Sequence, residues 1–410
     1  MRLRSFHTKN KKGVNIMVNV IIGADISTQS NKDIVDAEFC KTLLRDMTPV
    51  TDKADFRIAN LENVLCEEGT GAPIIKSGPN LYGLPKNISF LNEFKTDCAV
   101  LANNHFGDFG DEAIVSTLDI LKENKIAKIG GGMNLKEAYE AWYAEKDGMK
   151  IAFIAVCENE FGGAKENKPG SAGFDLKLLR DRIVEEKAAA DFVVVIFHGG
   201  NEYNPVPSPA VIDRYRLIID CGADALVAMH THCMQGFETY EGKPIIYSMG
   251  NFFFRKMSDK VPEHSPWNFG YLTELHFEKG KDITFDVIPY ALIDDGKHLH
   301  VLDGEQKEKI LAYLDKLSAV IQDRKEVNRL FDAWAYSMRG LARYLAYKPE
   351  FEASELPEDV HRTLAPTRNV LSCEAHNHLL THLLRMEFEG RVSEAKAAMS
   401  DLEALKKLPY

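Results

Sequence analysis

The stretch LANNHFGDFG, residues 101–110, connects an apolar run to an amphipathic helical pattern. The run CAVLAN at 98–103 has the length of a buried strand, and DEAIVSTLDILKEN at 111–124 repeats its apolar residues with a helical period. Gly107 and Gly110 permit a tight turn between them. This turn gathers four polar side chains: Asn103, Asn104, His105 and Asp108. A strand that passes through such a turn into a helix is typical of an α/β protein.

The same alternation of strand and helix continues along the chain. Other apolar runs of strand length lie at 18–24, 56–60, 151–156, 192–198, 225–230 and 244–250. Further helical patterns occupy about 32–46, 175–190 and 209–222. After Gly270 the sequence predicts two strands joined by a Lys-Gly turn, so we expect the sheets to end near residue 295.

The C-terminal part of the chain has a helical period from about residue 304 onward. One helical face carries Ile310, Leu314, Leu317 and Ile321. Another carries Val392, Ala395, Met399 and Leu402. We therefore predict a flexible leader at 1–17, an α/β domain at 18–295 and a helical region at 296–410.

Composition limits the classes of partner. The chain has 410 residues, of which 45% are hydrophobic, and a formal net charge of -11. This acidic balance argues against a nucleic-acid partner, which requires clustered Lys and Arg. Because the chain shows no apolar run near the ~20 residues that span a bilayer and no signal-peptide pattern, the sequence predicts a cytoplasmic protein without a membrane span. Its seven cysteines form no C-x-x-C pair, which favours reduced thiols.

Polar side chains that can bind metal follow the predicted strands, at the edge where open α/β sheets bind ligands. They are Asp25, Glu62, Asn104, His198, His230 and His232. Such a mixture of carboxylate, imidazole and carboxamide suits Mn²⁺, Fe²⁺ or Zn²⁺, so we expect one or two divalent ions per chain. Turn capping remains an alternative role for Asp25 and Glu62, and His198 could be a hydrogen-bonded core histidine.

Short motifs occur in a recognisable order, which begins with Asp25 and continues with NLE (60–62), ANNHFGD (102–108), FHGGNEY (197–203), MHTH (229–232) and GNF (250–252). Together they resemble the poly-γ-glutamate capsule-synthesis (CapA-like) family, a branch of the calcineurin-like metallophosphoesterases. The resemblance covers roughly residues 18–295. It implies a four-layer α/β/β/α sandwich with a dinuclear metal site at the strand ends, here followed by a C-terminal helical extension.

The resemblance also distributes the predicted ligands between two ions. Glu62 stands where the parent fold uses an aspartate to bridge both metals. The ligands of one ion correspond to Asn104, His198 and His230. Those of the other correspond to Asp25 and His232.

His105 and Asp108 have separate implied roles. His105 matches a histidine that faces the substrate rather than the metal, where it could protonate a leaving oxygen. Asp108 is placed to orient that imidazole and raise its basicity. Both would be catalytic residues.

The sequence departs from the parent phosphoesterase pattern at Ser27. The run reads DIS at 25–27, where an aspartate-x-histidine pair is expected. Because a hydroxyl is a poor substitute for imidazole, the ion at Asp25 and His232 has lost a strong ligand.

Other residues are candidates for contact with an anionic substrate. Glu202 and Tyr203 follow His198 closely and could line the substrate pocket, although an exposed loop pair fits the sequence equally well. Asn251 matches a family position near the site, and a turn asparagine is its alternative role. Lys76 is a cation that could meet a substrate anion or simply be solvated.

Three functions are consistent with these features. The first is a metallophosphoesterase that hydrolyses a small-molecule or polymeric phosphate ester with water activated at a dinuclear metal site. The second is a non-hydrolytic accessory or binding protein in poly-γ-glutamate biosynthesis, which the family resemblance implies. The third is a scaffold with a structural metal whose helical tail mediates homo-oligomerisation.

Overall fold

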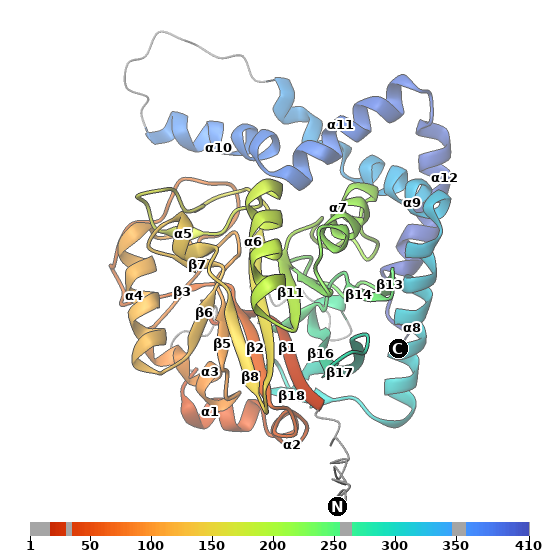
Figure 1. Cartoon of the computed structure of the whole chain (residues 1–410). Helices are drawn as coiled ribbons and strands as arrows, with labels where there is room; N and C mark the ends of the chain where they lie inside the picture. Colours follow the sequence, from red (N-terminus) through yellow and green to blue (C-terminus); the bar gives the residue numbers. More distant parts are fainter. Residues whose placement is uncertain (1–16, 30–34, 255–264, 347–357, 410) are drawn as a thin grey trace, which may run out of the picture.

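The computed structural model describes residues 17–29, 35–254, 265–346 and 358–409. Two β-sheets form the centre of the α/β part, and helices cover their outer faces (Figure 1). The C-terminal helices cross one end of the sheets and continue down one side (Figure 1). Apart from Met17, the predicted leader lies outside the described residues. The boundaries proposed for the three parts of the chain stay a prediction.

The first sheet contains β1, which carries Asp25. Its strand order is β18 (His298–Val301), β17 (Thr284–Ile293), β16 (Phe269–Glu278), β1 (Met17–Ser27), β2 (Phe56–Leu61), β5 (Cys98–Val100) and β6 (Ala127–Ile129), and β15 (Asn251–Phe254) pairs with the end of β1. The strands β1, β2, β5 and β6 are parallel, whereas β16 to β18 are antiparallel. The carboxyl ends of β1, β2 and β5 therefore lie at one edge.

The second sheet repeats this arrangement around β11, which carries His198. Its order is β13 (Phe237–Tyr240), β14 (Lys243–Ile246), β12 (Ala225–Met229), β11 (Phe192–His198), β9 (Met149–Cys157) and β8 (Trp142–Lys146). The four strands β9, β11, β12 and β14 are parallel. Separate two-stranded pairs join β3 (Val64–Leu65) to β4 (Tyr82–Gly83) and β7 (Gly131–Gly132) to β10 (Gly170–Ser171).

The two sheets pack on each other through apolar side chains. Phe277 of the first sheet contacts the rings of Phe153 and Phe192 of the second. Contacts place α1 (Ala37–Leu43), α3 (Ser89–Glu93) and α4 (Gly110–Glu123) on the first sheet, and α6 (Leu176–Ala189) and α7 (Pro209–Asp220) on the second. Shorter helices are α2 (Thr48–Thr51) and α5 (Leu135–Ala138). This arrangement confirms the predicted four-layer α/β/β/α sandwich.

Local sequence signals account for the limits of α7. Ser208 caps its first turn by accepting from the Val211 N–H, and Pro209 occupies the first helical position, where a missing N–H is tolerated. The helix ends before Gly222, whose φ of 115° disfavours residues with a side chain. Because α7 packs on β12, these signals help to fix the strand that precedes His230.

The C-terminal extension is helical, as predicted. It contains α8 (Gly304–Gln322), α9 (Arg324–Ser337), α10 (Glu358–Ser372), α11 (Glu374–Phe388) and α12 (Val392–Leu405). The predicted α8 face, with Ile310, Leu314 and Leu317, is buried. The first sheet extends past the expected limit of 295, because β18 pairs with β17 as far as Val301. In the part of the chain that the structure describes, no helix combines the length and apolarity required to cross a membrane.

Candidate metal centre

All of the predicted metal ligands lie at or just beyond the carboxyl ends of parallel strands. The first sheet contributes three of them, from β1, β2 and the turn after β5, and the second contributes three from β11 and the turn after β12. The two sheets bring these ends together, since the His230 N–H of one sheet donates to Asp25 Oδ2 of the other at 3.0 Å. All six side chains are buried: Asp25, Glu62, Asn104, His198, His230 and His232.

The ligand atoms form two overlapping groups that share Glu62. In the first group His198 Nε2 lies 3.5 Å from Glu62 Oε1 and 3.0 Å from His230 Nδ1. In the second group His232 Nε2 lies 3.9 Å from Glu62 Oε1, and Asp25 completes the set. Within each group, one ligand atom from every residue lies within 4.8 Å of the others. A carboxylate shared between two ligand groups has the arrangement of a bridging ligand.

Glu62 provides the test of whether these residues suit a cation. Both of its carboxylate oxygens are buried, and neither has a hydrogen-bond partner among the described residues. Burial, together with the charges of Asp25 and Glu202, raises the pKa of Glu62 well above its ordinary value. An isolated carboxylate is unfavourable in such surroundings, whereas a divalent cation would satisfy both oxygens. The donor set therefore fits one or two metal ions.

The imidazoles are already in the form that binds metal. Burial lowers the pKa of His198, His230 and His232 to about 3, so that all three are neutral at pH 7. His230 and His232 also adopt positive φ values of 107° and 54°. Such conformations are unfavourable for residues with a side chain and are found where surrounding structure imposes them, often at functional sites.

Asparagine side chains hold several ligands in place. The Asn60 Nδ2 group donates to Asp25 Oδ1 at 2.7 Å. Asn251 Oδ1 accepts from His232 Nδ1 at 2.8 Å, which leaves Nε2 as the nitrogen free to bind metal. Asn251, predicted to contact substrate, thus lies against His232, one of the predicted metal ligands.

Asn104 connects the ligand set to the C-terminal helices. Its Oδ1 lies 3.1 Å from His198 Nε2, and its Nδ2 donates to Glu160 Oε2 at 3.1 Å. Cys373, which precedes α11, donates to the other oxygen of Glu160 at 2.7 Å. Burial alone would raise the pKa of Glu160, but the neighbouring His230 ring and the hydrogen bonds from Cys373 and Asn104 outweigh burial and lower the pKa.

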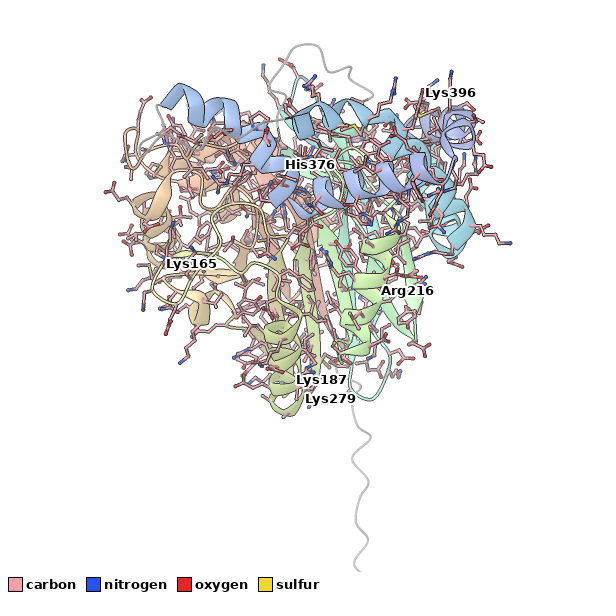
Figure 2. The ribbon with its side chains drawn as sticks, turned by 90° about the horizontal axis from the view of Figure 1, so that it is seen from above. Lys165, Lys187, Arg216, Lys279, His376 and Lys396 are labelled. Carbon is pink, nitrogen blue, oxygen red and sulfur yellow. The ribbon has the colours of Figure 1, made fainter. Side chains whose placement is uncertain are left out.

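Helices α9 and α11 lie over the candidate metal centre, next to Cys373. Trp334 and His376 line a cavity of about 90 Å³ together with Glu202, Tyr203 and His230. Viewed from above, α11 crosses the molecule, and His376 lies near the middle of that face (Figure 2). These helices therefore limit the space above the ligand group that contains His198 and His230.

His105 and Asp108 lie together beside the ligand set. Asp108 Oδ2 accepts from His105 Nδ1 at 2.7 Å, so His105 Nε2 is the nitrogen left for proton exchange. The ammonium group of Lys76 pairs with Asp108 Oδ1 and lies 3.2 Å from His105 Nδ1. Lys76 is thus buried against the His105–Asp108 pair rather than solvated.

Glu202 and Tyr203 lie next to the centre. Burial, followed by the charge of Glu160, raises the pKa of Glu202 to about 7. The Tyr203 side chain is exposed, and its ring stacks on Trp267 at 6.0 Å between centroids. Tyr203 and Trp267 border a cavity of about 310 Å³ that reaches His232. A substrate at the metal centre would have these side chains within reach.

Ser27 lies at the end of β1 in the predicted position. It is buried, and its hydroxyl accepts from the Gln29 N–H at 3.5 Å. The ligand group that contains Asp25 consequently has one imidazole, whereas the group that contains His198 has two.

Sequence reasoning missed Asn60 and Glu160. Asn60 ends β2, two residues before Glu62, and was considered only as a turn residue. Glu160 follows β9, which is adjacent to β11 in the second sheet. The strand-end rule that identified Asp25 and His198 would also have identified Glu160, if it had been applied to the run at 151–156.

Comparison with known proteins finds one matching family and several individual relatives. The family described as "Bacterial capsule synthesis protein PGA_cap" matches residues 16–256. The capsule biosynthesis protein CapA of Bacillus anthracis is 27% identical over 318 residues, which make up 76% of this chain and 74% of that protein. The PGA biosynthesis protein CapA of Bacillus subtilis is 26% identical over 259 residues, or 62% of this chain and 66% of that protein.

A solved structure that resembles this chain has a lower sequence identity to it than the two CapA relatives have. A phosphatase from Mycoplasma pneumoniae superimposes with a TM-score of 0.43 at 13% sequence identity. The match covers 68% of this chain and 95% of that one.

Proposed function

The chain belongs to the bacterial capsule synthesis protein family, and from this premise we propose that it is a metal-dependent hydrolase of phosphate esters. The single observation that carries the proposal is the unpartnered Glu62 carboxylate at the centre of three neutral imidazoles. His105, held by Asp108, lies beside this ligand set. A carboxylate that could bridge two ions, next to an oriented imidazole, is an arrangement that would support two-metal phosphoryl transfer.

The residues divide the chemical work between holding ions and moving a proton. Glu62, Asn104, His198 and His230 would hold one ion, and Glu62, Asp25 and His232 the other. Bound divalent ions supply positive charge that activates a water and stabilises negative charge on phosphoryl oxygens. With one imidazole in its ligand group, the ion at Asp25 is proposed to bind more weakly.

His105 is proposed as the general acid. Its Nδ1–H is fixed by Asp108, so that the imidazolium form, which also carries a proton on Nε2, can give that proton to the leaving oxygen and become neutral. Lys76 neutralises part of the Asp108 charge, because its ammonium group pairs with the other carboxylate oxygen. Lys76 therefore acts as a positioning residue for the pair.

A hydrolysis assay tests the proposal. Protein loaded with Mn²⁺ is given a generic phosphomonoester and a generic phosphodiester, and the diester is expected to be the better substrate. His105→Ala is expected to lower kcat by about 10²–10⁴-fold while metal content is unchanged. His276→Ala, which changes a histidine of β16, is the matched control. Absence of turnover with both substrates, or full activity in His105→Ala, would contradict the proposal.

A second candidate is an accessory role in the biosynthesis of an anionic glutamate polymer. The names of the two CapA relatives favour it. A groove of about 620 Å³ adjoins Gly107, and its lining includes three cationic side chains, Lys165, Lys168 and Arg368, and two acidic ones, Asp111 and Glu160. Such a groove would suit an extended polyanion.

Calorimetric titration with poly-γ-glutamate separates the two candidates. Binding that is weakened by Lys165→Ala and persists in His105→Ala would favour the accessory role. Binding that is unaffected by Lys165→Ala, or no detectable heat with and without Mn²⁺, would argue against it.

A further inference from the structure

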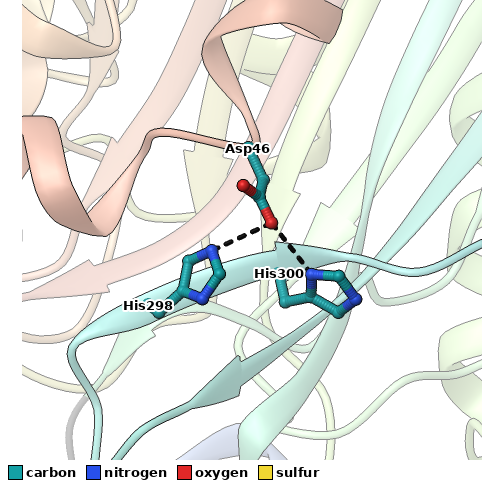
Figure 3. A group of neighbouring side chains, drawn as sticks. All are labelled: Asp46, His298 and His300. Carbon is teal, nitrogen blue, oxygen red and sulfur yellow. Dashed lines mark hydrogen bonds and ion pairs between the residues drawn. The ribbon is translucent and has the colours of Figure 1, made fainter.

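A cluster of two histidines and one aspartate lies at the edge of the first sheet, among residues that the candidate metal centre does not use. His298 and His300 alternate along the edge strand β18, so both rings extend from the same face. Asp46 lies between α1 and α2 and reaches the two rings (Figure 3). The cluster thus joins segments about 250 positions apart in the chain.

The three side chains converge on one point. Asp46 Oδ2 lies 2.9 Å from His298 Nε2 and 2.8 Å from His300 Nδ1 (Figure 3). One ligand atom from each residue lies within 4.8 Å of the others. Ligand atoms about 2.0–2.2 Å from a zinc ion are separated by distances of this order.

We propose that Asp46, His298 and His300 form a second cation site, which binds a borderline divalent ion such as Zn²⁺. Two imidazoles and one carboxylate are a donor set that such ions favour over Mg²⁺ or Ca²⁺. The proposal does not depend on the hydrolase activity, because it shares no residue with the centre at Glu62.

The surroundings of the cluster leave room for solvent. Arg45 Nη2 lies 3.0 Å from His298 Nδ1, and Asp294 Oδ2 lies 3.6 Å from the same nitrogen. The His298 side chain is 8% exposed, whereas those of Asp46 and His300 are 33% and 35% exposed. Water can therefore complete the coordination from the open side.

Arg45 opposes cation binding in this arrangement. Its Nε donates to His298 Nε2 at 3.2 Å and lies 3.8 Å from Asp46 Oδ1. The Arg45 side chain is 56% exposed, and its hydrogen bond to His298 Nε2 would have to break when an ion binds. Removal of this competing cation is therefore expected to tighten metal binding, which an ordinary ion-pair cluster would not do.

A second cluster on the same sheet is a weaker candidate. Glu274, His276 and Asp286 also lie close together, but they provide one imidazole instead of two. Asn19 Oδ1 lies 2.9 Å from His276 Nδ1, and Asp286 lies 3.1 Å from Nε2. His276 therefore provides the matched control for His298 and His300.

The test is a zinc titration of the full chain, followed by calorimetry and by elemental analysis. All variants carry Glu62→Ala, so that ions bound at the candidate metal centre do not obscure the result. In this background one zinc ion is expected to remain per chain. His298→Ala/His300→Ala is expected to lose it, whereas His276→Ala is expected to retain it.

Two more variants cover the case in which the double alanine variant does not fold. Asp46→Asn preserves the shape of the side chain, and it is expected to lose the zinc ion. Arg45→Ala is expected to bind zinc more tightly than the background. A background protein without bound zinc, zinc retained in Asp46→Asn, or unchanged affinity in Arg45→Ala would overturn the proposal.

Discussion

At the scale of single residues, Glu62 and Asp25 are two buried carboxylates with different hydrogen-bond partners. The Glu62 carboxylate is completely buried, and its oxygens have no hydrogen-bond partner in the described part of the chain. Asp25, by contrast, accepts from Asn60 and from the His230 N–H. The difference indicates that Asp25 is held by the fold, whereas Glu62 is left for a ligand.

Substitution of Glu62 tests this difference. Glu62→Gln is expected to lose bound metal, because the bridging charge is removed. Mn²⁺ at 100 times its Kd stabilises a protein by about 2.7 kcal/mol, so it should raise the Tm of the wild type and leave that of the variant unchanged. Thermal unfolding with and without Mn²⁺ measures the effect, with the exposed Glu67→Gln as control. Equal shifts in both variants would contradict the assignment.

Asn251 provides a second test at the same scale. Its Oδ1 orients His232, so Asn251→Ala is expected to weaken the ion at Asp25 and His232 by about 10–100-fold. The ion at His198 and His230 should bind with unchanged affinity. Calorimetric titration with Mn²⁺ would resolve the two steps, and equal weakening of both would show that Asn251 does not act through His232.

At the scale of elements, the C-terminal helices are held together by Asp332 of α9. His382 Nε2 of α11 lies 2.6 Å from Asp332 Oδ1, and Arg391 pairs with Oδ2. Burial alone would raise the pKa of Asp332, but hydrogen bonds from His382 and Arg391 outweigh it and lower the pKa. A depressed carboxyl pKa contributes stability above the unfolded value, and that stability is lost as pH falls through the folded value.

This linkage predicts how the helical region responds to acid. As pH falls from about 5 to about 3, the Tm of the wild type is expected to decrease more than that of Asp332→Asn. Asp315→Asn, at an exposed position of α8, is the matched control and should follow the wild type. Parallel pH profiles for wild type and Asp332→Asn would show that the ion pairs contribute no net stability.

The individual helices and strands were predictable from local sequence patterns, but the way in which they pack on one another was not. The run at 192–198 coincides with β11, because its short length and its β-branched valines and isoleucine favour a strand over a helix. The helices after 304 were predicted as well. Their position over the metal centre depends on pairs such as Cys373 with Glu160, and no local period records a contact between residues 213 positions apart.

At the scale of the whole molecule, the strand-end rule explains why residues that lie close together in the structure could be named from the sequence as candidate ligands. Parallel strands place their carboxyl ends at one edge of a sheet, so the positions of Asp25 and Glu62 at one sheet edge, and of His198 at the other, follow from topology. The direction in which a loop side chain points does not follow from strand topology. Lys76 pairs with Asp108, and Asn251 supports His232, because packing around each loop selects the partner. The edge strand β18 was missed because four residues carry little periodicity.

The most direct test of the central claim is anomalous diffraction from a crystal of the full chain soaked in Mn²⁺. We predict manganese peaks on both sides of the Glu62 carboxylate, with the peak at His198 and His230 stronger than the peak at Asp25 and His232. A map with no peak within coordination distance of Glu62 would contradict the account.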